Sequence, residues 1–96
     1  MFLKQKFIQD LKEALRGKDD LRINVLGMLL AGIGNKEIEL MKKESGLSEE
    51  EASAVLRKEI KNRNKAIEAF EKGGRQDLAR KEKTEKEILE KYLVQE

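Results

Sequence analysis

The chain has 96 residues, of which 39% are hydrophobic and 42% charged, and its 21 basic and 19 acidic side chains give a net charge of +2. It contains no proline, cysteine or histidine, which excludes disulfides, thiol and imidazole catalysis, and zinc sites built from cysteine or histidine. This composition is typical of one helical domain, and the near-neutral charge requires any nucleic-acid surface to come from local clustering of cations.

Two helices are predicted in the first half of the chain. Apolar side chains recur every three or four residues over residues 2–16, and Gly17 follows as a natural end. The next helix is predicted to begin near Asp19 or Asp20, either of which can cap it, and to run to about residue 44. Its middle, "VLGMLLAGIG", is apolar almost all round, which is typical of a central buried helix. That run is too short to cross a bilayer, which needs about 20 residues. Since no secretory signal peptide is visible either, a cytoplasmic protein without membrane contact is predicted.

Two further helices are predicted in the second half. The third begins at Ser48, because "SEEE" places Glu51 three residues after a serine, the pattern of a capping box. The fourth covers about residues 75–93, and only a double glycine separates the two, which predicts an antiparallel αα-hairpin. The expected fold is a single all-α, four-helix domain. Its predicted core is Phe7, Leu11, Leu15, Val25, Leu29, Leu30, Ile33, Leu56, Ile60, Ile67, Phe70, Ile88, Leu89 and Tyr92.

The stretch "FEKGGRQDL" forms the helix corner of this hairpin. Gly73 is predicted to take the left-handed conformation that ends the third helix, and Gly74 to cap the fourth. Asp77 favours the dipole of the fourth helix, whereas Arg75 opposes it. Arg75 is therefore expected to pair with Glu71 or Asp77, or to contact a ligand. A phosphate-binding loop is rejected, because no strand precedes the glycines and the Lys-Ser/Thr pair is missing.

Charges stand at core positions in the middle of the predicted hairpin. The facing positions of the two helices are apolar near both ends of the seam, but the register places Arg63 opposite Glu82 and Glu85. We expect Arg63 to pair with one of these carboxylates and to fix the register more than it adds stability, because desolvation offsets most of the attraction. The alternative is a seam that opens there to water.

Cations cluster on the third and fourth helices. The segment "RKEIKNRNK" has five basic residues and one acidic residue, and with the fourth helix it could face RNA phosphates. No aromatic side chains interleave for base stacking, so contact is expected with the backbone; the alternative is an ordinary solvated face. The predicted RNA-binding residues are Arg57, Lys58, Lys61, Lys65, Arg75, Arg80 and Lys83. No catalytic residue, metal site or cofactor is predicted, since neighbouring glutamates here lack a nucleophile or partner base.

The segments "KDDLRINVLGMLLAGIGNKEIE" and "VLRKEIKNRNKAIEAFEKGGRQDLARKEKTEKEILEKYL" resemble the GatB/YqeY-like family, over essentially the whole chain. This family shares a domain with the B subunit of the tRNA-dependent amidotransferase, which uses glutamine as nitrogen donor. The resemblance implies a helical fold and an association with carbon–nitrogen ligase activity, but it brings no catalytic residue onto this chain. Family members continue past "YLP" into a second helical part thought to contact tRNA. This chain reads "YLVQE", so residues 1–96 are expected to be the N-terminal four-helix part alone.

Two functions are weighed. The first is a non-catalytic accessory module that binds tRNA, or an amidotransferase or synthetase complex that holds tRNA. The second is a protein-interaction module, including a homodimer, that uses apolar surface left by the missing second part. Its expected contacts are Leu93, Val94 and the outer face of the second helix. An amidotransferase in its own right is the weakest of the interpretations.

Overall fold

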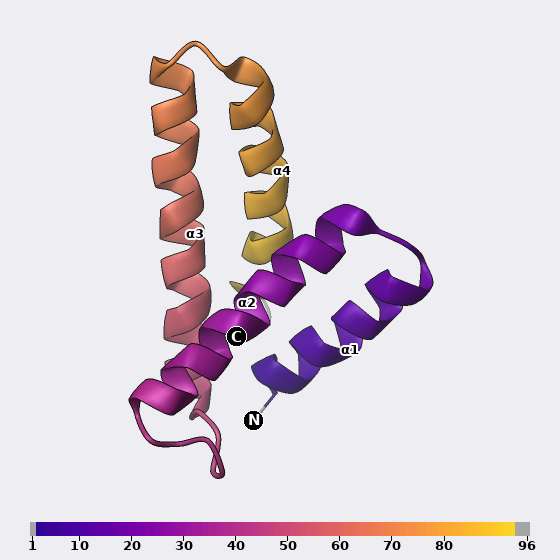
Figure 1. The fold of residues 1–96 in the computed structure, drawn as a ribbon, viewed down its shortest axis with the longest axis vertical. Coiled ribbons are helices and arrows are strands. Elements are labelled where there is room, and N and C mark those ends of the chain that lie inside the picture. The colour runs from indigo at the N-terminus through magenta and orange to yellow at the C-terminus, as the bar shows by residue number, and fades with distance from the viewer. Residues whose placement is uncertain (1, 94–96) are drawn as a thin grey trace.

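In this computed structural model, which describes residues 2–93, the chain forms four α-helices and no strand (Figure 1). Helix α1 covers Leu3–Arg16 and α2 covers Asp20–Glu39, while α3 covers Glu49–Lys72 and α4 covers Gln76–Leu93. Helices α3 and α4 pair as an antiparallel hairpin. The predicted all-α fold and its hairpin are confirmed.

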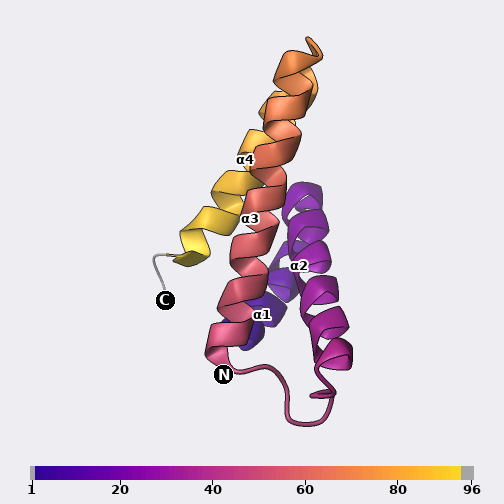
Figure 2. The same ribbon diagram turned by 90° about the vertical axis from the view of Figure 1, so that its left-hand side faces the viewer.

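The hairpin extends past the other two helices. Helices α1 and α2 pack across the end of the hairpin that lies away from its corner, and the corner stands well beyond them in both views (Figures 1 and 2). We call residues 61–87 the arm and the remaining described residues the base. The arm is thus a two-helix projection from a four-helix base.

The helix starts follow local capping chemistry. The Asp19 carboxylate accepts a hydrogen bond from the Arg22 N–H at 3.2 Å, which satisfies one free donor at the start of α2. At α3, the Glu51 N–H donates to the Ser48 hydroxyl at 3.1 Å and the Ser48 N–H donates to the Glu51 carboxylate at 2.8 Å. The predicted capping box is confirmed.

The ends of α1, α2 and α3 share one geometry. In each, the second residue after the helix has a positive φ: 55° at Lys18, 57° at Met41 and 73° at Gly74. At the corner, the Gly74 N–H bonds the Glu71 carbonyl at 3.2 Å, and the next N–H bonds the Phe70 carbonyl at 2.8 Å. This is the Schellman pattern. The prediction that Gly73 is left-handed was wrong, because Gly73 continues the helical turn with φ −83°.

Helix α2 ends earlier than predicted. The Lys42 N–H bonds the Glu37 carbonyl at 2.7 Å, and the chain turns at Met41. Lys42 Nζ then lies 2.8 Å from Glu51 Oε2, in the first turn of α3. The segment 40–44 therefore forms a connection that runs toward α3, where the sequence predicted continued helix.

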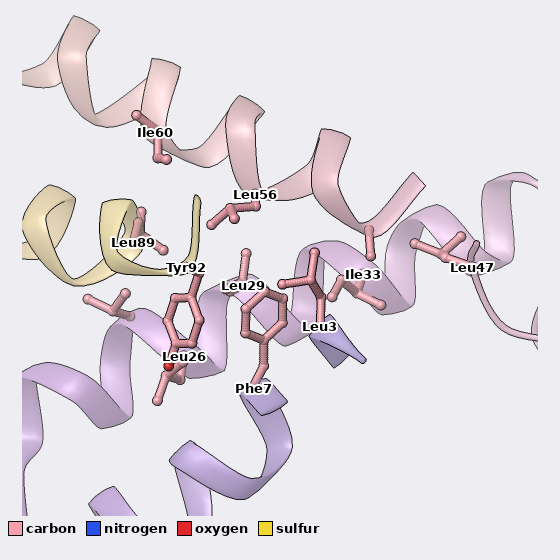
Figure 3. Close-up of a cluster of buried hydrophobic side chains, with 12 residues drawn as sticks. Leu3, Phe7, Leu26, Leu29, Ile33, Leu47, Leu56, Ile60, Leu89 and Tyr92 are labelled. Atoms are coloured by element: carbon pink, nitrogen blue, oxygen red, sulfur yellow. The ribbon is translucent and has the colours of Figure 1, made fainter. Parts of the chain in front are cut away.

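The hydrophobic core lies in the base (Figure 3). The Phe7 ring meets the Tyr92 ring edge-on, with centroids 4.9 Å apart, an arrangement that adds to their burial. Leu26 is fully buried although it was not predicted, whereas Leu15 is 54% exposed near the end of α1. Other predicted core residues are only half-buried, namely Leu11, Leu30, Phe70 and Ile88. The buried cluster comprises Leu3, Phe7, Val25, Leu26, Leu29, Ile33, Leu47, Ala52, Leu56, Ile60, Leu89 and Tyr92.

Candidate functional site

All seven predicted RNA-binding cations are exposed on α3, the corner and α4. Three residues on α3, Arg57, Lys61 and Lys65, follow one another at four-residue spacing and so share one outward face. No ion pair within residues 2–93 involves Lys58, Lys61, Lys65 or Arg80. Arg57 differs from them, because it donates a hydrogen bond to the Ser53 hydroxyl at 2.5 Å. The structure therefore leaves a row of cations on the outside of α3.

Two cations of α4, unlike Lys58, Lys61 and Lys65 of α3, form ion pairs with carboxylates among the described residues. Lys83 Nζ lies 3.0 Å from Glu71 Oε2, and Lys86 Nζ lies 4.0 Å from Glu90 Oε2. A shallow groove of about 280 Å³ between α3 and α4 is lined by both signs of charge, including Lys83, Lys86, Glu87 and Glu90. The structure thus does not join the two helices into one uniformly basic surface.

Positive charge is nevertheless concentrated on the arm. Residues 61–87 contain nine lysines and arginines and six acidic residues, a net charge of +3. Since the whole chain has 21 basic and 19 acidic residues, the rest carries 12 and 13, a net charge of −1. The near-neutral net charge of the whole chain is therefore the sum of a positive arm and a slightly negative remainder.

At the corner, Arg75 is paired within its own turn. Its guanidinium donates two hydrogen bonds to the Asp77 carboxylate, at 3.2 and 3.1 Å. This hydrogen bonding is the main cause that lowers the pKa of Asp77. Both side chains are more than half exposed, so the pair adds little stability. Arg75 was expected either to pair with Glu71 or Asp77 or to contact a ligand, and the structure pairs it with Asp77.

The seam places one guanidinium among three carboxylates. Arg63 Nε lies 3.4 Å from Glu82 Oε2 and 3.3 Å from Glu85 Oε2, and Arg63 Nη2 lies 3.9 Å from Glu59 Oε2. Arg63 also donates a hydrogen bond to the Met28 sulfur of α2 at 3.4 Å. The structure therefore brings the three predicted seam residues together, and Arg63 joins three helices where the arm meets the base.

Hydrogen bonding in this cluster is incomplete. Arg63 Nε and Glu82 Oε2 are buried atoms without a hydrogen-bond partner among the described residues, although their ion-pair distances are short. Burial raises the pKa of Glu85, the charge of Glu82 raises it further, and the charge of Arg63 lowers it. In a buried ion cluster of this kind, desolvation of the charged groups offsets much of their mutual attraction.

A second buried charge lies in the base and was missed from the sequence. Asp10 is 5% exposed and accepts a hydrogen bond of 2.5 Å from the Tyr92 hydroxyl. Lys6 Nζ lies 3.3 Å from Asp10 Oδ1, and Arg22 Nη2 lies 4.0 Å from Asp10 Oδ2. Burial and the bond to Asp10 raise the pKa of Tyr92, so its hydroxyl stays protonated. These side chains line a cavity of about 520 Å³ between α1, α2 and α4.

The signal that could have found Asp10 is the one that found Arg63. Asp10 follows Phe7 at helical spacing, on the buried stripe of α1. Glu37 likewise follows Ile33 in α2, is 6% exposed and pairs with Lys4 at 2.8 Å. A charged residue at a core position therefore predicts a buried ion pair in all three cases.

Two other properties concern the chain from residue 2 to residue 93. No cluster of three or more acidic side chains is arranged there to hold a metal ion. None of its helices combines the length and apolar character needed to cross a membrane.

The fold and its charged hairpin place the protein in the class of small all-α domains built on a long helical hairpin. The family model described as "Yqey-like protein" matches residues 4–96. The chain therefore belongs to the YqeY-like family, as its resemblance to the GatB/YqeY-like family predicted.

Three of the curated relatives share one name. The chain is 42% identical over 87 residues to "Altered inheritance of mitochondria protein 41, mitochondrial" of Lachancea thermotolerans, which covers 91% of this chain and 46% of the relative. Proteins of the same name in Eremothecium gossypii and Saccharomyces cerevisiae are 35% and 36% identical, with 90% of this chain covered in each case and 46% and 45% of the relative. The chain thus spans about half the length of the curated relatives it matches.

These names correct the predicted location. The prediction of a cytoplasmic protein was wrong, because the relatives are named as mitochondrial proteins. It rested on the lack of a secretory signal peptide, a feature that does not distinguish the cytoplasm from mitochondria.

Proposed function

We propose that this chain is a non-catalytic accessory module that binds tRNA, or a complex of tRNA with protein, through the arm and the turn of α3 that precedes it, which carries Arg57 and Lys58. The observation that carries the proposal is the net charge of +3 on residues 61–87, against −1 on the rest of the chain. The resemblance implies that the family is related to the B subunit of the amidotransferase, an enzyme that acts on tRNA. This relationship favours tRNA over other RNAs as the ligand.

The expected contacts are made to phosphates. Lys58, Lys61 and Lys65 are exposed along α3, so their ammonium groups can reach successive phosphate oxygens without first breaking an ion pair. Phe70, the aromatic side chain of the arm, is half-buried, so it does not offer a fully open face for base stacking. Recognition by this surface therefore depends on shape and charge, with little reading of bases.

The test measures binding of fluorescently labelled tRNA by anisotropy at two salt concentrations. If three phosphates are neutralised, affinity should fall by about 40-fold between about 50 and 200 mM salt. A variant with Arg57, Lys61 and Lys65 changed to glutamate should lose most binding at the lower salt concentration. A control with Lys12, Arg16 and Lys18 changed to glutamate makes the same charge change on exposed residues of the base and should bind nearly as wild type.

Two results would contradict the RNA proposal. One is absence of binding by the wild-type chain at low salt. The other is an equal loss of affinity in the two triple variants, which would show that total charge, and not the arm, governs binding. Circular dichroism of both variants shows whether the fold is retained.

A second function, protein interaction or homodimerisation, is favoured by exposed apolar side chains on α2 and just after it. Ile38 is 64%, Met41 92% and Met28 51% exposed. Of the contacts expected for such a module, Leu93 packs partly against the core, and Val94 lies outside the described residues. Light scattering of wild type and of a variant with Ile38 and Met41 changed to lysine tests this function. A concentration-dependent dimer that the variant loses would support it, and a monomer throughout would oppose it.

A further inference from the structure

The cavity between α1, α2 and α4 lies in the base and has no part in the proposed RNA surface. Its volume of about 520 Å³ lies within the range of about 300–1,000 Å³ that is usual for small-molecule sites. Three separate elements supply its polar lining: Lys6 and Asp10 come from α1, Arg22 from the first turn of α2, and Lys91 and Tyr92 from the end of α4.

The floor of the cavity is already ordered. Asp10 and Tyr92 are 5% and 4% exposed, and the hydroxyl of Tyr92 donates its single proton to Asp10. Tyr92 is held in place by its edge-on contact with Phe7 in the core. The floor is therefore fixed by the packing of the fold and does not have to form when a ligand enters.

Arg22 has more donors than its neighbours in the cavity use. Its guanidinium interacts with the Tyr92 hydroxyl by hydrogen bonding and charge, which offsets part of the rise that burial and Asp10 cause in the pKa of Tyr92. A guanidinium has five N–H groups, and Arg22 Nη2 approaches the nearest oxygen of Asp10 only to 4.0 Å, too far for a hydrogen bond. Its side chain is 37% exposed, and that of Lys6 is 44% exposed. Donors from both can reach an oxyanion in the cavity, and the fork of an arginine matches a carboxylate or phosphate group.

We propose that this cavity binds a small ligand through one carboxylate or phosphate group, held by Arg22 with help from Lys6 and Lys91. The lining also contains Glu13 and Asp19 at its edge. Together with Asp10 they balance the three cations, so the cavity has no excess positive charge with which to attract a polyanion. A small metabolite that offers one anionic group to Arg22 is therefore favoured over a nucleic-acid backbone.

The experiment follows backbone amide signals by NMR while sodium phosphate or sodium acetate is added, with sodium chloride at matched ionic strength as reference. Saturable shifts should appear at Arg22, Lys91 and Tyr92 and not at the corner of the arm. Phosphate and acetate represent the two oxyanion classes. The anion whose shifts saturate at the lower concentration identifies the class that the cavity prefers.

Variants locate the binding. Arg22→Gln should weaken the affinity by about tenfold or more, as expected for loss of charge-assisted hydrogen bonds, and Arg22→Lys, which keeps the charge without the fork, should weaken it less. Lys43→Gln, an equal charge change at an exposed residue of the connection between α2 and α3, should have no effect. Should Arg22→Gln unfold, Lys91→Gln at the exposed edge still tests the site and should lower the affinity severalfold.

The proposal would be overturned if neither anion shifted the cavity signals beyond the chloride reference, or if Lys43→Gln weakened binding as much as Arg22→Gln.

Discussion

The base and the arm both bury charge, but they satisfy it differently. In the base, Asp10 receives a hydrogen bond from Tyr92 and Glu37 receives one from Lys4, so each carboxylate has a donor. At the foot of the arm, Arg63 alone faces Glu59, Glu82 and Glu85. Its Nε atom and one oxygen of Glu82 lack hydrogen bonds among the described residues.

The base also buries more apolar side chains than the arm does. The buried cluster lies in the base, whereas the buried apolar residues of the arm are only Ile67 and Ala79 within the described chain. The base is therefore held by hydrophobic burial, and the arm by the hairpin seam and by its attachment at Arg63. We therefore expect the arm, which carries most of the exposed cations, to be the less stable part of the molecule, where adjustment to a partner costs least.

The largest expected effect is loss of a buried leucine in the base. Leu29→Ala removes a fully buried side chain and should lower the free energy of unfolding by about 3–5 kcal/mol. The matched change in the arm, Ile67→Ala, should cost about 2 kcal/mol, at the low end of the range for such substitutions. Urea unfolding of the two variants measures the difference. Equal losses would contradict the division between base and arm.

Removal of Arg63 should have the next largest effect. Arg63→Met leaves three carboxylates without their cation and should cost about 3 kcal/mol. When Glu82→Leu and Glu85→Leu are added, the loss should be largely recovered, because the two carboxylates nearest to Arg63 Nε are then replaced by apolar side chains and only Glu59 remains. Thermal or urea unfolding of both variants tests this. If the triple variant were no more stable than Arg63→Met, the ion cluster would add net stability to the fold in addition to fixing the register of the hairpin.

Glu85 gives the cluster a pH dependence. Its pKa is raised above 4.5 in the folded protein, mainly by burial. The folded state therefore binds a proton more readily than the unfolded state, and the stability linked to Glu85 rises as pH falls through the folded pKa toward 4.5. Glu85→Gln should be more stable than wild type near neutral pH, and the gap should narrow on acidification to about pH 5. If the stability difference between Glu85→Gln and wild type stayed constant or widened on acidification, the pKa of Glu85 would not be raised by folding.

The smallest effects are expected at the residues of positive φ that follow α1, α2 and α3. Lys18 and Met41 adopt φ values of 55° and 57°, which cost a residue with a Cβ about 1 kcal/mol relative to glycine. Met41→Gly should therefore raise the free energy of unfolding by about 0.5–1 kcal/mol, and Gly74→Ala at the corner should lower it by a similar amount. Chemical unfolding resolves these changes. A loss of stability in Met41→Gly would contradict this reading of the turn.

The sequence was most informative where local signals and helical register agreed. The capping box at Ser48 and the double glycine located α3 and its hairpin, and the register of that hairpin selected Arg63, Glu82 and Glu85. Register alone also predicted too much burial, as at Leu15, because a helical stripe does not show how far the neighbouring helix extends.

What could not be predicted depends on contacts between distant segments. The sequence after residue 39 favours helix, yet the chain turns at Met41, and Lys42 pairs with Glu51 of α3. For the candidate site, the cations of the arm were predictable, and Asp77 was one of the two carboxylates expected for Arg75. The pairing of Lys83 with Glu71 was not predicted, since pairing depends on side-chain geometry. The cavity at Asp10 needed three elements to be placed together before it could be recognised.

Native-state hydrogen exchange, resolved by residue, tests the division of the molecule most directly. Amides of Leu29 and Ile33 in the base should exchange only with global unfolding, whereas those of Ile67, Phe70 and Ala79 in the arm should open with a clearly lower free energy. Arg63→Met should lower the protection of the arm more than that of the base. One common opening free energy for both regions would contradict the account.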